Sequence, residues 1–88
     1  MRHLAAALLL AAGCGASPPE PESPGAVVLQ QRCGGCHPVY APGSMTIAMW
    51  EVKLEAMRRL FAQQQIPWLT EDEERTLVAY LRRHAGEQ

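Results

Sequence analysis

The stretch Cys33-Gly34-Gly35-Cys36-His37 determines how the rest of this 88-residue chain is interpreted. Two cysteines three positions apart, followed directly by a histidine, form the arrangement through which a haem becomes covalently attached to a protein. Each thiol forms a thioether bond with one vinyl group, and the histidine becomes the proximal ligand of the iron. One helical turn separates residues three apart, so the motif suits the end of a helix. The sequence therefore predicts haem attachment at Cys33 and Cys36, with His37 on the iron.

Two other kinds of site share the Cys-x-x-Cys pair, namely a redox dithiol and half of a zinc site. A zinc site needs two more ligands at regular spacing, and His3 and His84 do not form such a pair. A thioredoxin-like dithiol is expected inside a βαβ unit, and no strand-like run lies near the motif. The adjacent histidine therefore favours haem attachment over both.

The first 13 residues have the composition of a secretory signal peptide. A short basic start precedes an apolar run over residues 4–12 that is too short to span a bilayer. The small residues that follow end at Cys14, and this resembles the bacterial lipoprotein signal, in which that cysteine becomes the lipidated first residue. Ala11 stands where the lipoprotein signal usually has leucine, so ordinary cleavage near the same place is the alternative. Either way, residues 1–13 predict export.

Residues 14–25 are predicted to be a proline-rich linker, and residues 26–88 a single small domain. The linker has no large apolar residue, so it is expected to be extended. It fits a tether that holds the domain close to a membrane, and it fits equally well a disordered spacer with no particular role. From residue 26 onward, seven basic residues balance seven acidic ones. This balance gives no reason to expect a nucleic-acid partner, and the domain contains no run long enough to cross a membrane.

The domain is predicted to be all-α, because no stretch alternates like a strand and three segments have helical signals. The first segment runs from Ala26 to about Cys33, with Ser23 as a plausible N-cap and Pro24 at the first helical position. The second runs from about residue 46 to 64 and carries an apolar stripe at helical spacing. The members of that stripe are Ile47, Trp50, Leu54, Met57 and Phe61.

The third helix has the clearest start signal. Thr70 is a good N-cap, Glu73 completes a capping box, and acidic residues fill the first turn. Basic residues occupy the last turn, and Gly86 is expected to end the helix. The acidic cluster is therefore interpreted as a capping device rather than as a docking patch.

Through its motif the chain resembles the c-type cytochromes. The pattern Trp50-x-x-x-Leu54-x-x-Met57, followed by a proline-bearing turn and an acid-rich capped helix, resembles a group of short single-haem domains. This group includes the cytochrome subunits of sulfite dehydrogenases and the haem domains of quinohaemoprotein amine dehydrogenases. The resemblance covers residues 32–85 and implies a small three-helix domain around one covalent haem c with its iron.

The stretch from Cys36-His37 through Tyr40 and Pro42, together with the tryptophan at position 50, also resembles one half of small dihaem cytochromes. Those proteins use a histidine ten residues after the tryptophan as an iron ligand. This chain has Leu60 at that position, which argues against an iron with two histidine ligands.

The sixth ligand of the iron is predicted to be Met57. Most c-type cytochromes take a methionine from the loop before the last helix, but residues 65–70 contain none. In the single-haem group the methionine at the Met57 position is the axial ligand. Met45 is the second candidate, and Met49, His84 or an open position remain as alternatives.

The family pattern suggests two kinds of supporting role. A proline carbonyl in the loop after the motif commonly accepts a hydrogen bond from the ligand histidine, and Pro42 is the matching residue; it also fits a simple turn position. Trp50 and Trp68 are expected either to donate a hydrogen bond to a haem propionate or to wall the haem pocket.

These features together predict an exported single-haem cytochrome that carries one electron at a time between redox proteins, and not an enzyme. We expect it in the periplasm or cell envelope, as a monomer or a subunit of a redox complex, with a lipidated Cys14 as the candidate membrane tether. The alternative is a haem-based sensor or a peroxidase-like protein with an open or labile sixth position on the iron.

Overall fold

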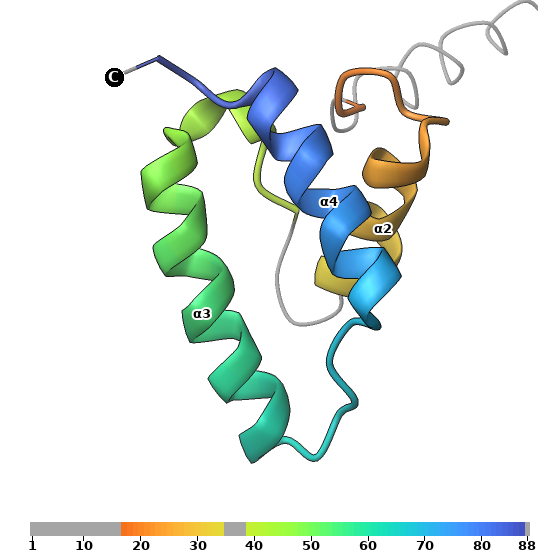
Figure 1. Ribbon diagram of the computed structural model, residues 1–88, viewed down its shortest axis with the longest axis vertical. Coiled ribbons are helices and arrows are strands. Elements are labelled where there is room, and N and C mark those ends of the chain that lie inside the picture. Colours follow the sequence, from red (N-terminus) through yellow and green to blue (C-terminus); the bar gives the residue numbers. More distant parts are fainter. Residues whose placement is uncertain (1–16, 35–38, 88) are drawn as a thin grey trace, which may run out of the picture.

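The computed structural model describes residues 17–34 and 39–87, and this part of the chain is all-α, as predicted (Figure 1). Its elements are α2 (Pro24–Cys33), the short 3-10 helix η2 (Pro42–Ser44), α3 (Ile47–Gln63) and α4 (Glu71–His84). Within these ranges, the single β-type pairing is an isolated bridge between Thr46 and Gly86. The three predicted helices are therefore confirmed to within one or two residues at each end.

The helix starts follow the local signals in the sequence. Thr70 caps α4: its hydroxyl accepts from the Glu73 N–H (3.1 Å), and the Glu73 carboxylate accepts from the Thr70 N–H (2.9 Å). Thr46 caps α3 by accepting from the Met49 N–H at 3.2 Å. Ser23 precedes α2 as predicted, but its hydroxyl donates to the Glu20 carbonyl instead of capping the helix. The predicted capping box is confirmed.

Helices α2 and α4 form a closely packed antiparallel pair (Figure 1). The start of α2 lies on the second half of α4, where Gly25 is buried directly under Tyr80. The end of α2 lies beside the first turn of α4, where Arg32 pairs with Glu73. Leu29, Leu77 and Leu81 fill the space between the two helices and are almost wholly buried.

Helix α3 packs less closely on this pair, and polar and aromatic contacts hold it near both of its ends. Near its start, the carbonyl of Met45 accepts the Gly86 N–H at 2.9 Å. Near its end, Arg58 pairs with Glu74 at 2.9 Å, and Phe61 meets the Trp68 ring edge to face at 5.0 Å. Between these attachments, α3 turns its buried stripe toward the interior.

Residues 17–23, the last part of the predicted linker, lie against the C-terminal half of α4. The Tyr80 hydroxyl donates to the Pro19 carbonyl at 2.6 Å, and Glu20 lies 3.3 Å from His84 and 3.5 Å from Arg83. A turn at Glu20, whose φ is +46°, brings the chain into α2. We call residues 17–23 the N-terminal strap, because side chains of α4 hold them against that helix.

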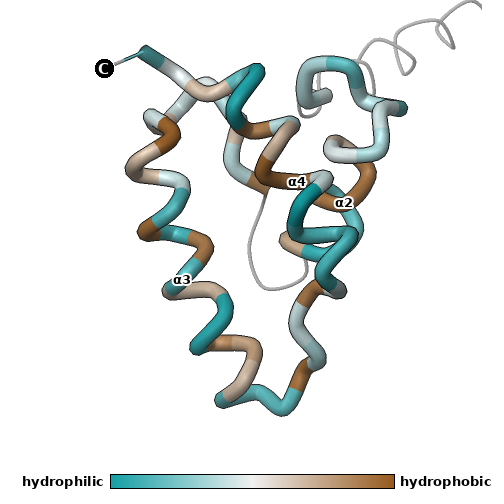
Figure 2. The backbone as a smooth tube through the Cα atoms, viewed as in Figure 1, coloured by the Kyte–Doolittle hydropathy of each residue, from teal (hydrophilic) through white to brown (hydrophobic). Residues whose placement is uncertain are grey.

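The hydropathy of α4 changes along its length. Figure 2 shows hydrophilic positions at both ends of this helix and hydrophobic ones in its middle. The acidic residues of the first turn and the basic residues of the last turn both complement the helix dipole. Among residues 17–34 and 39–87, no helix combines the length and apolarity needed to cross a bilayer.

The close approach of α2 to α4 yields a first prediction. A Cβ added in Gly25→Ala would collide with Cβ and Cγ of Tyr80, so the two helices would have to separate. Although alanine is the better helix former, we expect a net loss of about 1–3 kcal/mol in the free energy of unfolding, the usual cost of overpacking. Guanidinium unfolding of the haem-loaded protein, followed by circular dichroism, measures this loss.

Gly43→Ala is the matched control, because the nearest atom to its added Cβ is the His84 carbonyl oxygen at 3.7 Å. Its effect should stay within about 0.5 kcal/mol. Equal stability of the two variants would show that the contact between Gly25 and Tyr80 does not limit how closely α2 packs.

Candidate haem site

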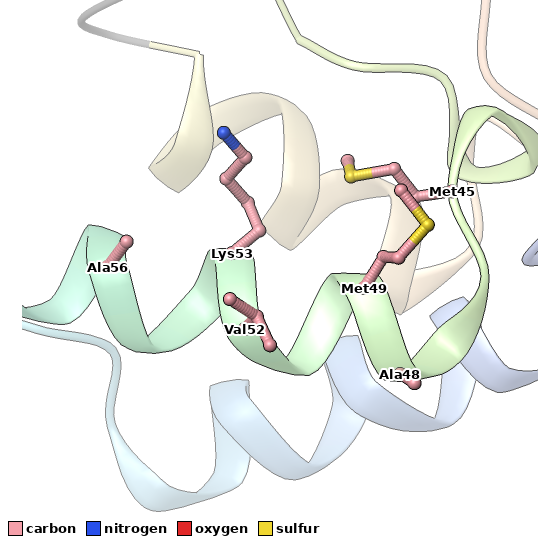
Figure 3. Close-up of a pocket in the computed structure, with 6 residues that line it drawn as sticks. All are labelled: Met45, Ala48, Met49, Val52, Lys53 and Ala56. Carbon is pink, nitrogen blue, oxygen red and sulfur yellow. The ribbon is translucent and has the colours of Figure 1, made fainter.

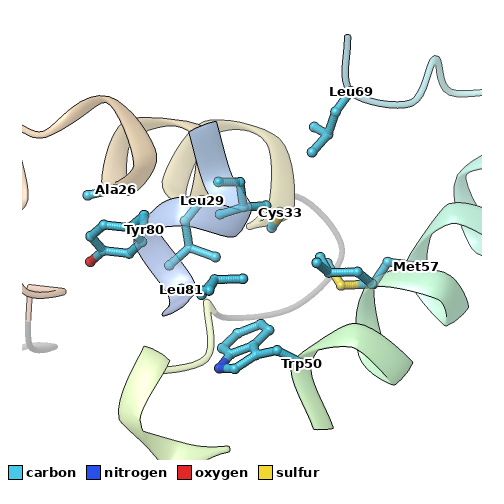
Figure 4. Close-up of a cluster of buried hydrophobic side chains, with 10 residues drawn as sticks. Ala26, Leu29, Cys33, Trp50, Met57, Leu69, Tyr80 and Leu81 are labelled. Atoms are coloured by element: carbon cyan, nitrogen blue, oxygen red, sulfur yellow. The ribbon is translucent and has the colours of Figure 1, made fainter. Parts of the chain in front are cut away.

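Cys33, the first cysteine of the motif, is the last residue of α2 and is 5 % exposed. It belongs to the buried cluster that also contains Trp50, Met57 and Leu69. Figure 4 shows these four side chains directed toward one interior region from α2, α3 and the segment before α4. Cys36 and His37 lie outside the described residues, so their predicted roles stay predictions. The position of Cys33 at a helix end agrees with the expected placement of the motif.

The environment of Cys33 is apolar. Burial raises the pKa of its thiol to about 11, and the nearby positive charge of Arg32 offsets only part of this effect. The thiol is therefore protonated at neutral pH, whereas reactive dithiols depend on a lowered pKa. This environment disfavours the redox-dithiol alternative and suits a cysteine that is consumed in a thioether bond.

Met57 lies in the middle of α3 and is 6 % exposed. Trp50 and Leu54 precede it on the same face, and all three side chains are buried. In Figure 4 the sulfur atoms of Met57 and Cys33 lie on facing sides of the same interior region. The structure thus brings together the two predicted site residues that it describes.

The segment between α3 and α4, where most c-type cytochromes carry their methionine, has a structural role here. The Arg32 guanidinium donates to the Pro67 carbonyl and to the Glu73 carboxylate, both at 2.7 Å. The Trp68 indole donates to Glu74 at 3.0 Å, and Leu69 is buried in the core. The segment therefore ties the end of α2 to the start of α4 and contributes Leu69 to the interior around Cys33.

The charge on Glu73 is stabilised by these contacts. The hydrogen bond from the Thr70 N–H is the main reason that the pKa of Glu73 lies below its usual value, and Arg32 lowers it further. Because the folded-state pKa is depressed, this contribution to stability is present at neutral pH and is lost as the pH falls through the folded-state pKa.

Trp50 is 1 % exposed, and its indole N–H donates to the Pro42 carbonyl at 2.8 Å. The indole N–H groups of Trp50 and Trp68 thus both donate to partners within the protein. This favours the prediction that the two rings wall the haem pocket over the prediction that they bind a haem propionate. A carbonyl oxygen has two lone pairs, so Pro42 retains the capacity to accept a second hydrogen bond. Its predicted bond with His37 remains a prediction, because that residue lies outside the described part.

Of the alternative methionines, Met49 lies in the first turn of α3 and Met45 directly follows η2. Met45 and Met49 line a cavity of about 550 Å³ together with Ala48, Val52, Lys53 and Ala56 (Figure 3). Neither Cys33 nor Met57 lines this cavity. Met49 is 52 % exposed, and Met45 only flanks the core cluster. Burial therefore distinguishes Met57 from the other two methionines.

His84, the remaining alternative ligand, lies at the wrong end of α4. Its ring packs on Tyr80, with 4.8 Å between ring centroids, and faces Glu20 of the N-terminal strap. Because α2 and α4 are antiparallel, Cys33 lies near the opposite end of this pair, about 15 Å away along the ten residues of α2. The structure does not bring His84 together with Cys33.

The described residues fit a haem. The interior region is walled by apolar side chains, no charged or polar residue is buried there, and one thiol and one thioether enter it. The part of the chain that the structure describes contains no group of three or more His, Cys, Asp or Glu side chains able to hold a metal ion. A porphyrin needs an apolar interior, and it does not need a cluster of metal-binding side chains.

An all-α domain whose buried helix end carries the first cysteine of a Cys-x-x-Cys-His motif has the character of a c-type cytochrome. Comparison with protein families agrees with this class, because the family model for dihaem cytochrome c matches residues 29–88. The chain therefore belongs to the dihaem cytochrome c family. Neither the curated proteins nor the solved structures gave a match.

The family confirms the predicted resemblance to c-type cytochromes and, with it, covalent haem c and iron as the cofactor. The 88 residues contain a single Cys-x-x-Cys-His motif, whereas the name of the family specifies two haems. Position 60 corresponds to the ligand histidine of the small dihaem cytochromes that the sequence resembles, and here it is a half-buried leucine of α3.

Sequence reasoning missed the partners of Arg32 and Trp50. Arg32 directly precedes the motif, and a positive charge beside a buried cysteine was a usable signal. The pairing between Trp50 and Pro42 had no such signal, because nothing in the order of residues indicates which carbonyl an indole reaches.

The buried hydrogen bond of Trp50 generates a second prediction. Trp50→Phe keeps an aromatic ring but removes the indole donor to the buried Pro42 carbonyl, so the free energy of unfolding should fall by about 1–3 kcal/mol. The matched change Trp68→Phe removes a half-exposed bond that water replaces, and should cost less than about 1 kcal/mol. Chemical unfolding of the two haem-loaded variants compares them, and the reverse order would contradict this account.

Proposed function

We propose that this chain is an exported, single-haem c-type cytochrome that carries one electron at a time between redox proteins and has no enzymatic activity of its own. The observation that carries the proposal is the apolar interior in which Cys33 of the haem-attachment motif faces Met57. When bound, the haem supplies an iron that alternates between the ferric and ferrous states.

The chain's own residues have distinct roles in this proposal. Cys33 and Cys36 hold the group through thioether bonds, and His37 is the proximal ligand. Met57 would supply the second protein ligand to the iron, and a thioether in that place would favour the ferrous state and so raise the reduction potential. Trp50 and Leu69 exclude water from the site, because both are buried beside Cys33 and Met57.

The proposed setting is the periplasm or cell envelope of a bacterium. The apolar run over residues 4–12 supports export, and the cysteine at position 14 supports lipid attachment to a membrane. The working surface is the exposed edge of the haem, which weakly and briefly contacts partner redox proteins. The resemblance of residues 32–85 to short single-haem domains supports the assignment of one haem to this chain.

The identity of the second ligand is tested by absorption spectroscopy of the ferric protein. Met57→Ala should abolish the weak far-red band that methionine ligation gives, and should allow the ferrous protein to bind carbon monoxide. Met45→Ala and Met49→Ala are matched controls that remove a thioether from the neighbouring cavity, and both should keep the band. Tight carbon monoxide binding by the unmodified protein would instead support a sensor or a peroxidase-like enzyme.

The number of haems is tested by the mass of the intact purified protein, expressed together with haem-attachment machinery. We expect the mass of the chain plus one haem, because the sequence contains one motif. Cys36→Ala should leave at most one thioether bond and shift the absorption of the ferrous haem. A mass corresponding to two haems would contradict the single-haem proposal.

A further inference from the structure

The N-terminal strap places a limit on where a membrane anchor lies relative to the domain. Its main contact is the hydrogen bond of 2.6 Å from Tyr80 to the Pro19 carbonyl, and Tyr80 is fully buried. Gln30 of α2 donates to the Pro21 carbonyl at 3.1 Å, so the strap contacts both helices of the pair. Residues 19–23 therefore belong to the folded domain and contribute no free length to a tether.

Only a few residues remain between the strap and the proposed lipid on Cys14. Five residue steps separate Cys14 from Pro19, and a fully extended chain spans at most about 17 Å over that length. The lipid must therefore enter the bilayer close to the surface formed by the strap and the last turn of α4. We call this region the anchor-side surface; it comprises residues 17–23 and 82–84.

We propose that the anchor-side surface of the lipidated protein lies against the membrane surface and that the haem-bearing end of α2 points away from it. This inference rests on the proposed lipidation of Cys14. Helix α2 begins at the strap and ends at Cys33, so its ten residues separate the motif from the anchor-side surface by about 15 Å. Partner proteins are then met on the aqueous side, and not at the bilayer.

The orientation is set by the short connection rather than by charge. The two arginines of the anchor-side surface already have carboxylate partners, since Arg82 lies 3.7 Å from Glu51 and Arg83 lies 3.5 Å from Glu20. Glu22 of the strap adds a further negative charge to this surface. This surface therefore has no excess of basic side chains that could bind anionic lipid. Vesicles of neutral phosphatidylcholine should give the same orientation as vesicles with anionic lipid.

The test uses two single-cysteine variants of the full-length, haem-loaded, lipidated protein in phosphatidylcholine vesicles. Arg82→Cys places a thiol on the anchor-side surface, and Asp72→Cys places one in the first turn of α4 at the other end. Both native side chains are well exposed, at 62 % and 85 %. The motif cysteines are consumed by the haem, so a bulky water-soluble maleimide reports only the new thiol.

We expect vesicle attachment to slow modification at position 82 several-fold, relative to the same variant made soluble by Cys14→Ser, and to leave position 72 unchanged. Inserting ten glycine and serine residues between Ala16 and Ser17 should remove the protection at position 82 while the protein stays in the membrane fraction. Equal protection at both positions, or protection that survives the insertion, would overturn the proposed orientation.

The two proposals fail in different ways. If Cys14 is not lipidated, the unmodified protein is recovered in the soluble fraction, and the proposed anchor fails together with the orientation. If the protein sediments with vesicles but its two ends react equally, the anchor holds and the orientation alone is wrong.

Discussion

The close contact between α2 and α4 at Gly25 is the constraint on which the rest of the domain depends. Because Gly25 has no side chain, the start of α2 rests directly on Tyr80, and the two helices stay close along their whole antiparallel length. Burial of Leu29, Leu77 and Leu81 between them then follows. The pair carries the strap at one end and Cys33 at the other. The contact at Gly25 sets the approach of the helices at the first end, and Arg32 ties the second end to Glu73 and Pro67.

Helix α3 joins the domain through contacts near both of its ends and through the buried face between them. Its two ends are joined to the rest of the chain by polar and aromatic contacts, whereas its middle faces the interior with Trp50, Leu54 and Met57. The contacts near its ends and the buried side chains between them hold α3 against the core that contains Cys33.

The parts of this arrangement that could be predicted from the sequence are those with local causes. The capping box of Thr70 and Glu73, the stripe on α3 and the adjacent residues of the motif all depend on neighbours within four positions, so spacing alone indicates them. The strap, the bond from Trp50 to Pro42 and the two contacts of Arg32 join residues that are distant in the chain or that have no local signal. The linker composition over residues 14–25 indicates an extended chain but does not indicate that Pro19 meets Tyr80.

The absence of methionine from residues 65–70 has a physical counterpart in what those residues do. Each residue of this segment already has a contact: Pro67 accepts from Arg32, Trp68 donates to Glu74, and Leu69 is buried in the core that contains Cys33. A ligand carried there would have to share its segment with these contacts. With Met57 as the ligand, the thioether is instead held by a 17-residue helix whose own hydrogen bonds fix its backbone. A ligand on a helix fixed at both ends moves little when the charge of the iron changes, and small movement is what an electron carrier requires.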